Sequence, residues 1–338
     1  MTTDELGGFT TVKSVCILGG TGLIGYAATK AFLDTEDYRV TTFSLPPVPE
    51  DGVLDARAKH HFGDINEMSD AEIVKFLKGQ DIFIFAGGVN AHYIPKKPAK
   101  AFFFQANVEP VQHLAQLARQ AGVSRFILCT SFYNYFHALW PDMQLTELHP
   151  YIYASVEQEM RLLAENGNGL ETIALRLPYV VGLVPGRVSA WQTYAKRLQR
   201  REFPLYVDHH NKATGGSCYM TAKQVGQALV GAASEDVVPK SYTLGWRNIS
   251  NEAFLMQAKR ALQSDIKIKT LTLREFQAVA RKEAHEIELA GREAGFEPVA
   301  YTELLTRALY VNPIEALDVL DYHADNVEKA IQEVFTTL

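Results

Sequence analysis

Apolar and polar positions alternate along the first half of the chain with two different periods. Residues 12–18 form an apolar run that ends at glycines, and residues 26–33 continue with the spacing of a helix. Residues 38–45 form a second strand-like run, rich in β-branched residues and closed by two prolines. The pattern then predicts a helix at 70–77, a strand at 81–85, a helix at 110–120, a strand at 125–129, a helix from 150 to about 165 and a strand at 171–175.

This alternation indicates the architecture of the fold. Several predicted strands are apolar on both faces, so we expect a parallel sheet covered by helices on two sides, which is a doubly wound α/β fold of the Rossmann type. Beyond residue 178 the alternation loosens, and helices dominate from residue 251. We therefore expect a Rossmann domain over residues 1–176. Residues 177–338 should form a smaller, mainly helical substrate lobe, with some segments returning to the first domain.

Composition and charge narrow the range of functions. The chain has 338 residues, of which 47% are hydrophobic and 21% charged, with a net charge of −6, as is typical of a soluble globular protein. Its longest basic runs are pairs of residues, so we expect neither a nucleic-acid nor a membrane partner. The start of the sequence is polar and acidic, and no apolar run approaches the roughly 20 residues that span a bilayer. A cytoplasmic protein that acts on a small molecule is the expectation.

Cysteine and histidine positions give no sign of a metal site. The three cysteines, Cys16, Cys129 and Cys218, are an odd number without metal-ligand spacing, so we expect them to be reduced and structural. His209 and His210 are adjacent, and adjacent side chains diverge on any regular element. Because no third ligand lies near them, we predict no metal.

The turn after the first predicted strand carries the pattern G-x-x-G-x-x-G. Glycines let the chain turn sharply and let the backbone approach a pyrophosphate, whose charge then lies at the amino end of the next helix. No Gly-Lys-Ser/Thr sequence closes the turn, so a nucleoside-triphosphatase loop is not expected. The turn therefore predicts dinucleotide binding through Gly19, Thr21, Gly22, Leu23, Ile24 and Gly25.

The end of the second strand bears on the choice of dinucleotide. An acidic residue about 20 positions after the glycines accepts hydrogen bonds from the adenosine ribose and selects NAD. This chain has Ser44 there. A hydroxyl tolerates a 2′-phosphate that a carboxylate would repel, although no arginine follows immediately to bind it. On this ground we favour NADP(H) over NAD(H).

A likeness to a known family covers nearly the whole chain. The segments that carry it are Gly63-Asp64-Ile65, Ala86-Gly87-Gly88, Asn107-Val108, residues 121–131, Arg176-Leu177-Pro178 and residues 320–331. In this order they resemble the landmarks of the extended short-chain dehydrogenase/reductases, a group that includes nucleotide-sugar epimerases and dehydratases. The resemblance implies cofactor contacts beyond the glycine-rich turn, at Asp64, Ile65, Ala86, Gly87, Gly88, Asn107, Tyr151, Leu177 and Pro178.

The active site departs from the pattern of that family. Ser131 matches the family's catalytic serine, and Tyr151 its catalytic tyrosine, but Ser155 stands where a lysine follows four residues later. In the family the lysine binds the nicotinamide ribose and lowers the pKa of the tyrosine. Without it the phenol stays protonated at neutral pH, donates a hydrogen bond and is a poor base, which impairs carbonyl reduction less than alcohol oxidation. Taking Tyr153 instead places Glu157 at the lysine position, which is worse.

Other polar and aromatic residues are weaker candidates. His92, Tyr93, His137 and His149 lie in predicted loops where this fold binds ligands, although loop histidines are usually solvated surface. Aromatic residues at 102–104 and 132–140 are typical of core or dimer packing. The resemblance also implies a homodimer through the helices near residues 102–121 and 151–165.

Two functions from different classes remain open. One is an enzyme, a reductase, epimerase or lyase that uses Ser131 and Tyr151 on an unidentified small molecule. The other is a catalytically degenerate dinucleotide-binding sensor or regulator. We favour the enzyme. Residues 177–273, which would shape the substrate pocket, contain no motif that identifies the substrate.

Overall fold

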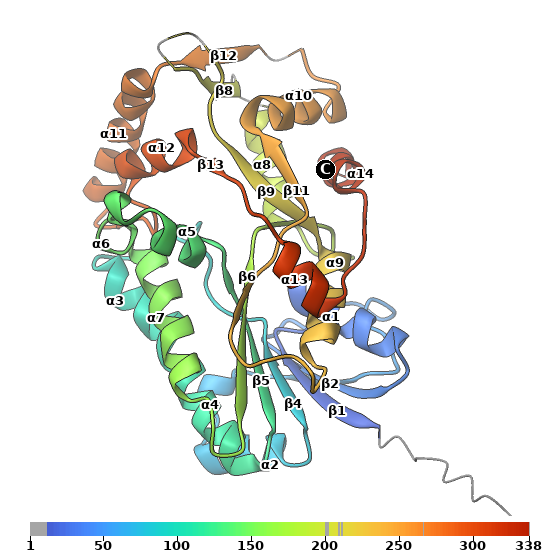
Figure 1. The fold of residues 1–338 in the computed structure, drawn as a ribbon. Helices are drawn as coiled ribbons and strands as arrows, with labels where there is room; N and C mark the ends of the chain where they lie inside the picture. The colour runs from blue at the N-terminus through green and yellow to red at the C-terminus, as the bar shows by residue number, and fades with distance from the viewer. Residues whose placement is uncertain (1–11, 200–202, 209, 211, 266, 338) are drawn as a thin grey trace, which may run out of the picture.

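A seven-stranded parallel sheet forms the centre of the protein. The computed structural model describes residues 12–337 except 200–202, 209, 211 and 266. The strands of the central sheet are arranged in the order β10-β6-β5-β4-β1-β2-β3, and every neighbouring pair is parallel (Figure 1). Their bounds are β1 Lys13–Leu18, β2 Tyr38–Ser44, β3 Lys59–Phe62, β4 Ile82–Phe85, β5 Arg125–Ser131, β6 Glu171–Leu177 and β10 Ser241–Thr243.

Helices cover both faces of this sheet. Successive residues of β1 enter opposite cores: Val15 packs on one side and Cys16 on the other. One core lies under α1 and α9, and the other under α2, α4 and α7 (Figure 1). This arrangement confirms the predicted doubly wound α/β fold. The helices are α1 Leu23–Asp34, α2 Asp70–Leu77, α4 Glu109–Ala121, α7 Pro150–Ala164 and α9 Ala222–Ala232.

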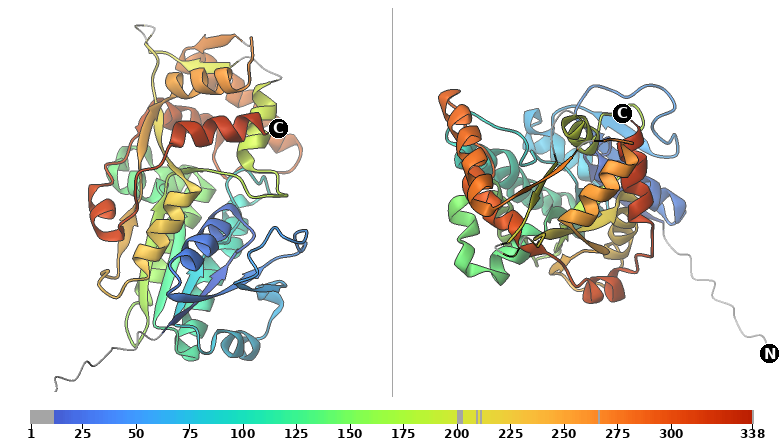
Figure 2. Two further views of the ribbon diagram at one scale, coloured as in Figure 1. Left: turned by 90° about the vertical axis from the view of Figure 1, so that its right-hand side faces the viewer. Right: turned by 90° about the horizontal axis from the view of Figure 1, so that it is seen from above.

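The second half of the chain builds a smaller lobe on the carboxyl edge of the sheet, as Figure 2 shows. A second sheet joins β7, β9, β11 and β13, and β8 pairs with β12. Helices dominate beyond residue 251, as predicted. The strands of the lobe are β7 Tyr179–Val181, β8 Phe203–Tyr206, β9 Gly216–Thr221, β11 Arg247–Ser250, β12 Ile268–Leu271 and β13 Ala308–Leu309; its helices include α8 Ala190–Leu198, α10 Asn251–Ala261, α11 Leu273–Leu289, α12 Pro298–Thr306 and α14 Val327–Thr336.

Segments of the second half also return to the central sheet. Strand β10 pairs with β6 at the edge of that sheet, and α9 packs against α1. Helix α13 (Ile314–Leu320) adds Ala316 and Leu320 to the core on the same face. None of the helices in the described part of the chain is both long and apolar enough to span a bilayer.

Candidate functional site

The glycine-rich turn joins β1 to α1 at the carboxyl edge of the central sheet. Gly19 has a φ of +93°, and a Cβ atom there would lie 2.7 Å from the carbonyl oxygen of Ala86. A Cβ atom on Gly25 would overlap the carbonyl group of Gly19. These two glycines are therefore required by the packing of the protein itself.

Gly22 is less closely packed than the other two glycines. A Cβ atom there would meet a single described atom, the carbonyl oxygen of Gly19, at 3.2 Å. Gly22 is the N-cap of α1 and provides no side-chain cap, so the backbone N–H groups at the start of the helix remain available to a ligand. This is the geometry that a pyrophosphate requires.

Ser44, at the end of β2, holds the glycine-rich turn through a hydrogen bond. Its side chain is only 2% exposed, and its hydroxyl accepts a hydrogen bond of 3.1 Å from the backbone N–H of Thr21. The hydroxyl is thus buried against the turn.

Asp64 and Ile65 have structural roles in the described fold. The carboxylate of Asp64 caps the short helix η1 (Ile65–Glu67) by accepting a hydrogen bond of 2.9 Å from the N–H of Asn66. Ile65 is 6% exposed and packs in the same core as Phe43. Of Asp64 and Ile65, only Asp64 is exposed enough for its side chain to contact a ligand.

The turn after β4 is held by a buried asparagine. Asn107, in the π-helical segment η2 (Phe104–Val108), accepts a hydrogen bond of 2.8 Å from the N–H of Val89 and donates one of 2.9 Å to its carbonyl. Gly88 has a φ of +122°, and a Cβ atom there would press on the Asn107 amide. Asn107 therefore shapes the turn, whereas Gly87 and Gly88 are its exposed part.

Ser155 lies beneath the end of β5 in a network of buried polar side chains. It is 5% exposed, and its hydroxyl lies 3.1 Å from that of Thr130. The Asn134 amide donates to the Ser155 carbonyl at 3.1 Å and to the Glu159 carboxylate at 2.7 Å. The charge of Glu159 is in turn matched by Arg176. Ser155, which the resemblance sets at the family's lysine position, is thus part of an internal network.

Ser131 and Tyr151 are half-buried at the same edge of the sheet. The Ser131 hydroxyl accepts a hydrogen bond of 3.3 Å from the N–H of Tyr133. The ring of Tyr151 contacts Phe103 and Phe296, and its N–H donates to the carbonyl of Gly295 at 2.9 Å.

Burial raises the pKa of Tyr151 to about 12, with a smaller contribution from Tyr179. Among the described residues, none forms a hydrogen bond with the Tyr151 hydroxyl. The phenol is therefore protonated at neutral pH, as predicted.

Three other phenols, which no sequence motif connects, meet beside this site. The hydroxyls of Tyr133 and Tyr179 are 3.0 Å apart, and each lies 3.3 Å from that of Tyr301. Burial raises the pKa of Tyr133 and of Tyr301 well above the ordinary value. Because Tyr301 follows Tyr133 by 168 positions, no local pattern could have revealed the cluster.

The loop histidines do not converge on one point. His149 is 1% exposed, its Nδ1 accepts the N–H of Glu297, and burial lowers its pKa to about 4, so it is a neutral structural residue. His92 is exposed, and partial desolvation together with the charge of Arg197 lowers its pKa. His137 lies on α5 (Tyr133–Leu139). His210 is described but His209 is not, so the predicted absence of a metal pair lies partly outside the described residues.

The cysteines and the predicted aromatic residues have structural positions. Burial raises the pKa of Cys129 to about 12 and that of Cys218 to about 11, so both thiols are inert. Phe132 and Phe136 are core residues. The described residues contain no group of three or more potential metal ligands.

One residue at the glycine-rich turn escaped the sequence analysis. Arg187 follows a tight turn between β7 and α8, and its guanidinium donates to the carbonyl and the hydroxyl oxygens of Thr21 at 2.6 and 3.0 Å. The dipeptide Pro185-Gly186 predicts such a turn. Nothing in the sequence indicates where the turn leads.

The seven-stranded sheet, its two helical layers and the open glycine-rich turn define the Rossmann class of α/β proteins. A sequence profile of the NAD dependent epimerase/dehydratase family matches residues 15–214. The chain therefore belongs to this family, which confirms the resemblance to the extended short-chain dehydrogenase/reductases. A comparison with curated protein sequences gave no match.

Solved structures share the fold over almost the whole chain. The protein gox2253 has a TM-score of 0.73 at 17% identity, over 95% of this chain and 96% of its own. The UDP-glucuronic acid 4-epimerase from Bacillus cereus, in complex with UDP-glucuronic acid and NAD, has a TM-score of 0.67 at 13% identity, over 95% and 98% of the two chains. The UDP-glucose 4-epimerase from Thermotoga maritima, with UDP-glucose, has a TM-score of 0.66 at 14% identity, over 95% and 97%. At such identities the likeness extends to the fold alone.

Proposed function

We propose that the protein binds a nicotinamide dinucleotide across the glycine-rich turn. The observation that carries this proposal is the contrast within the turn. Side chains at Gly19 and Gly25 would clash with the protein, whereas a Cβ at Gly22, the N-cap of α1, would meet only the Gly19 carbonyl oxygen, at 3.2 Å. The membership of an NAD dependent family supports it. The remaining cofactor contacts that we propose are Thr21, Leu23, Ile24, Ser44, Asp64, Ile65, Ala86, Gly87, Gly88, Asn107, Tyr151, Leu177 and Pro178.

The reacting end of the cofactor would lie beside Ser131. Strand β5 ends at Ser131 opposite Leu177 of β6, so Leu177 and Pro178 border the same spot as the serine and the phenols. A cofactor bound there would supply or accept a hydride. Ser131 would donate a hydrogen bond to a substrate oxygen, and the Tyr151 phenol would give that oxygen its proton.

The protonated state of Tyr151 favours one direction of reaction. A phenol with a pKa of about 12 releases its proton only to a strongly basic oxygen, such as the one formed when a carbonyl is reduced. Removing a proton from an alcohol would require the phenolate. We therefore propose a reductase, epimerase or lyase acting on a small molecule, with carbonyl reduction as its easier step. Two structural neighbours are described in complex with UDP-sugars, which supports sugar-type substrates as the first class to test.

A second candidate is a non-catalytic dinucleotide sensor. The observation in its favour is Ser155, which belongs to the internal network, while among the described residues no cation acts on the pKa of the Tyr151 phenol. The two candidates differ in the effect of Tyr151→Phe. In an enzyme this change abolishes the consumption of NADPH or NADH with a panel of carbonyl compounds and leaves cofactor binding intact. In a sensor, the wild type consumes neither.

The proposal also covers the cellular location and the oligomeric state of the protein. We place it in the cytoplasm as a homodimer that has no nucleic-acid or membrane partner. The proposed interface includes α7, on which Met160 is 61% exposed, two helical turns from Tyr153 on the same face. The Tyr153 ring is stacked on that of Phe104. The domain division at residues 176 and 177 also stays part of the proposal.

A further inference from the structure

A tight turn in the second lobe carries a cation to the glycine-rich turn. The backbone N–H of Arg187 donates to the carbonyl of Val184 at 3.2 Å, and Gly186 has a φ of +72°. Proline at the second position and glycine at the third are what such a turn demands. The same turn approaches the loop between β2 and β3, because a Cβ atom on Gly186 would lie 4.0 Å from a methyl group of Val53.

The guanidinium of Arg187 is held in place by Thr21, but no described carboxylate pairs with its charge. Only Nη1 is used, in the two hydrogen bonds to Thr21. Within the described residues Nε and Nη2 have no acceptor, and no carboxylate lies within the distance of an ion pair. Three N–H donors with a full positive charge therefore remain available beside the turn, on an exposed side chain.

Arg187 lies on the side of the proposed cofactor site where this fold holds the adenosine. The residue at the end of the second strand is the one that meets the adenosine ribose in this fold, and here that residue, Ser44, is hydrogen-bonded to the N–H of Thr21. Arg187 is hydrogen-bonded to the carbonyl and the hydroxyl of the same Thr21. Arg187 and Ser44, the position where a carboxylate would exclude a 2′-phosphate, thus both contact Thr21.

We propose that Arg187 binds the 2′-phosphate of NADP(H), so that a residue of the substrate lobe determines the cofactor preference. The inference rests on the proposed dinucleotide site and adds to it the missing basic residue. Nε and Nη2 would donate charge-assisted hydrogen bonds to the phosphate oxygens. Nη1 keeps the guanidinium on Thr21.

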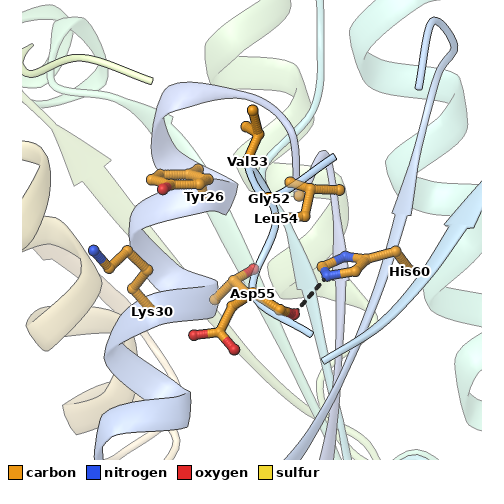
Figure 3. A pocket seen from close by; sticks show the side chains of 9 residues that line it. Tyr26, Lys30, Gly52, Val53, Leu54, Asp55 and His60 are labelled. Carbon is orange, nitrogen blue, oxygen red and sulfur yellow. Dashed lines mark hydrogen bonds between the residues drawn. The ribbon is translucent and has the colours of Figure 1, made fainter. Parts of the chain in front are cut away.

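A neighbouring cavity offers a competing location for the phosphate. It has a volume of about 170 Å³ and lies between α1 and the loop before β3 (Figure 3). Tyr26 and Lys30 line it on one side, and Asp55 and His60 on the other. Hydrogen bonds from Arg57 lower the pKa of Asp55 to about 2, so the cavity holds a carboxylate that is ionised at neutral pH. Because Asp55 is ion-paired with Arg57 at 2.7 Å, its charge does not exclude a phosphate from the cavity, and a Lys30 variant separates the two locations.

The test is to titrate the full-length protein with NADP⁺ and with NAD⁺ by calorimetry. Arg187→Gln should weaken NADP⁺ binding about tenfold or more and leave NAD⁺ binding within about twofold, because only the former loses a charge-assisted contact. Lys30→Gln should change neither affinity. Arg197→Gln removes the same charge from an exposed site on α8 and controls for net charge.

Each other outcome would overturn the inference. Equal weakening of both dinucleotides by Arg187→Gln would assign the arginine to the pyrophosphate. A selective loss in Lys30→Gln would assign the 2′-phosphate to the cavity. Unchanged affinities in all variants would reduce Arg187 to a support of the turn and leave the proposed function standing. If the wild type binds neither dinucleotide, the proposed function itself fails and the inference fails with it.

Discussion

At the scale of single residues, the proposed cofactor site depends on the absence of a side chain at Gly22. Gly22→Val should abolish cofactor binding detectable by calorimetry, because its side chain would stand where the pyrophosphate approaches the helix. The protein should still fold, with a loss of about 1–3 kcal/mol in unfolding free energy, since the new Cβ meets one backbone atom, the Gly19 carbonyl oxygen, at 3.2 Å. Gly25→Val is the matched control and should prevent folding. Unchanged affinity in Gly22→Val would refute the site.

Ser155 tests whether the active site has been rebuilt. An ammonium introduced by Ser155→Lys would enter the buried network of Thr130 and Asn134, so we expect a loss of about 2 kcal/mol or more in unfolding free energy and no gain in affinity for NADPH or NADH. Ser155→Ala should lose about 1 kcal/mol and keep the affinity. Tighter binding in the lysine variant, together with a lowered pKa of Tyr151, would show instead that the original geometry survives.

His149 makes stability depend on pH. Its pKa is about 4 in the folded protein and about 6.5 when unfolded, so the unfolded state binds the proton more tightly. The stabilisation is present above pH 6.5 and is lost as the pH falls toward 4. This group should account for about 2 kcal/mol of the unfolding free energy lost between about pH 7.5 and 5. Urea titrations of His149→Gln should show that much less dependence on pH, and an identical dependence in both proteins would contradict the assignment.

At the scale of elements, the phenol cluster ties α12 to α5 and β7. Tyr301→Phe removes a hydroxyl that lies 3.3 Å from each of two others, so we expect a loss of about 1–2 kcal/mol in unfolding free energy. Tyr310→Phe is the control, because that side chain is 38% exposed and its hydroxyl has no hydrogen bond among the described residues. Equal stabilities of the two variants would show that the cluster contributes nothing.

The elements that the sequence revealed are those with a strong local pattern. The predicted helix at 70–77 coincides with α2, whose capping box at Ser69 and Glu72 defines its start. Strand β3 was missed because its sequence, Lys-His-His-Phe, lacks an apolar pattern and pairs on one side only. Strand β10 was missed because three residues are too few to show a period.

Within the candidate site, too, some residues lie in a recognisable local motif and others do not. The glycine-rich turn, Ser131 and Tyr151 could be predicted as candidates because each lies in a short sequence motif. The buried direction of the Ser44 hydroxyl, the phenol cluster and the contact of Arg187 with Thr21 depend on pairings between distant segments. Such pairings follow from the tertiary fold and have no signature in the separate segments.

At the scale of the whole molecule, the proposed dimer can be tested on α7. Met160→Glu would place a charge in the proposed interface, so sedimentation should show monomers where the wild type shows dimers. Met256→Glu is the control, because that residue is 42% exposed on α10, away from the interface. A monomeric wild type, or a dimeric Met160→Glu variant, would exclude this interface.

The strand β10 that completes the central sheet has a consequence for synthesis on the ribosome. At about 5–20 residues per second, roughly 3 to 13 seconds pass between the emergence of Leu177, at the end of β6, and that of Ser241, at the start of β10. During this interval the nascent chain exposes an unpaired strand edge, and α9 is only partly available to cover the apolar face above α1. Nascent chains that stall within this window should therefore associate with one another or recruit chaperones. Release from the chaperones should wait for the synthesis of β10, which lies far along the sequence from the glycine-rich turn.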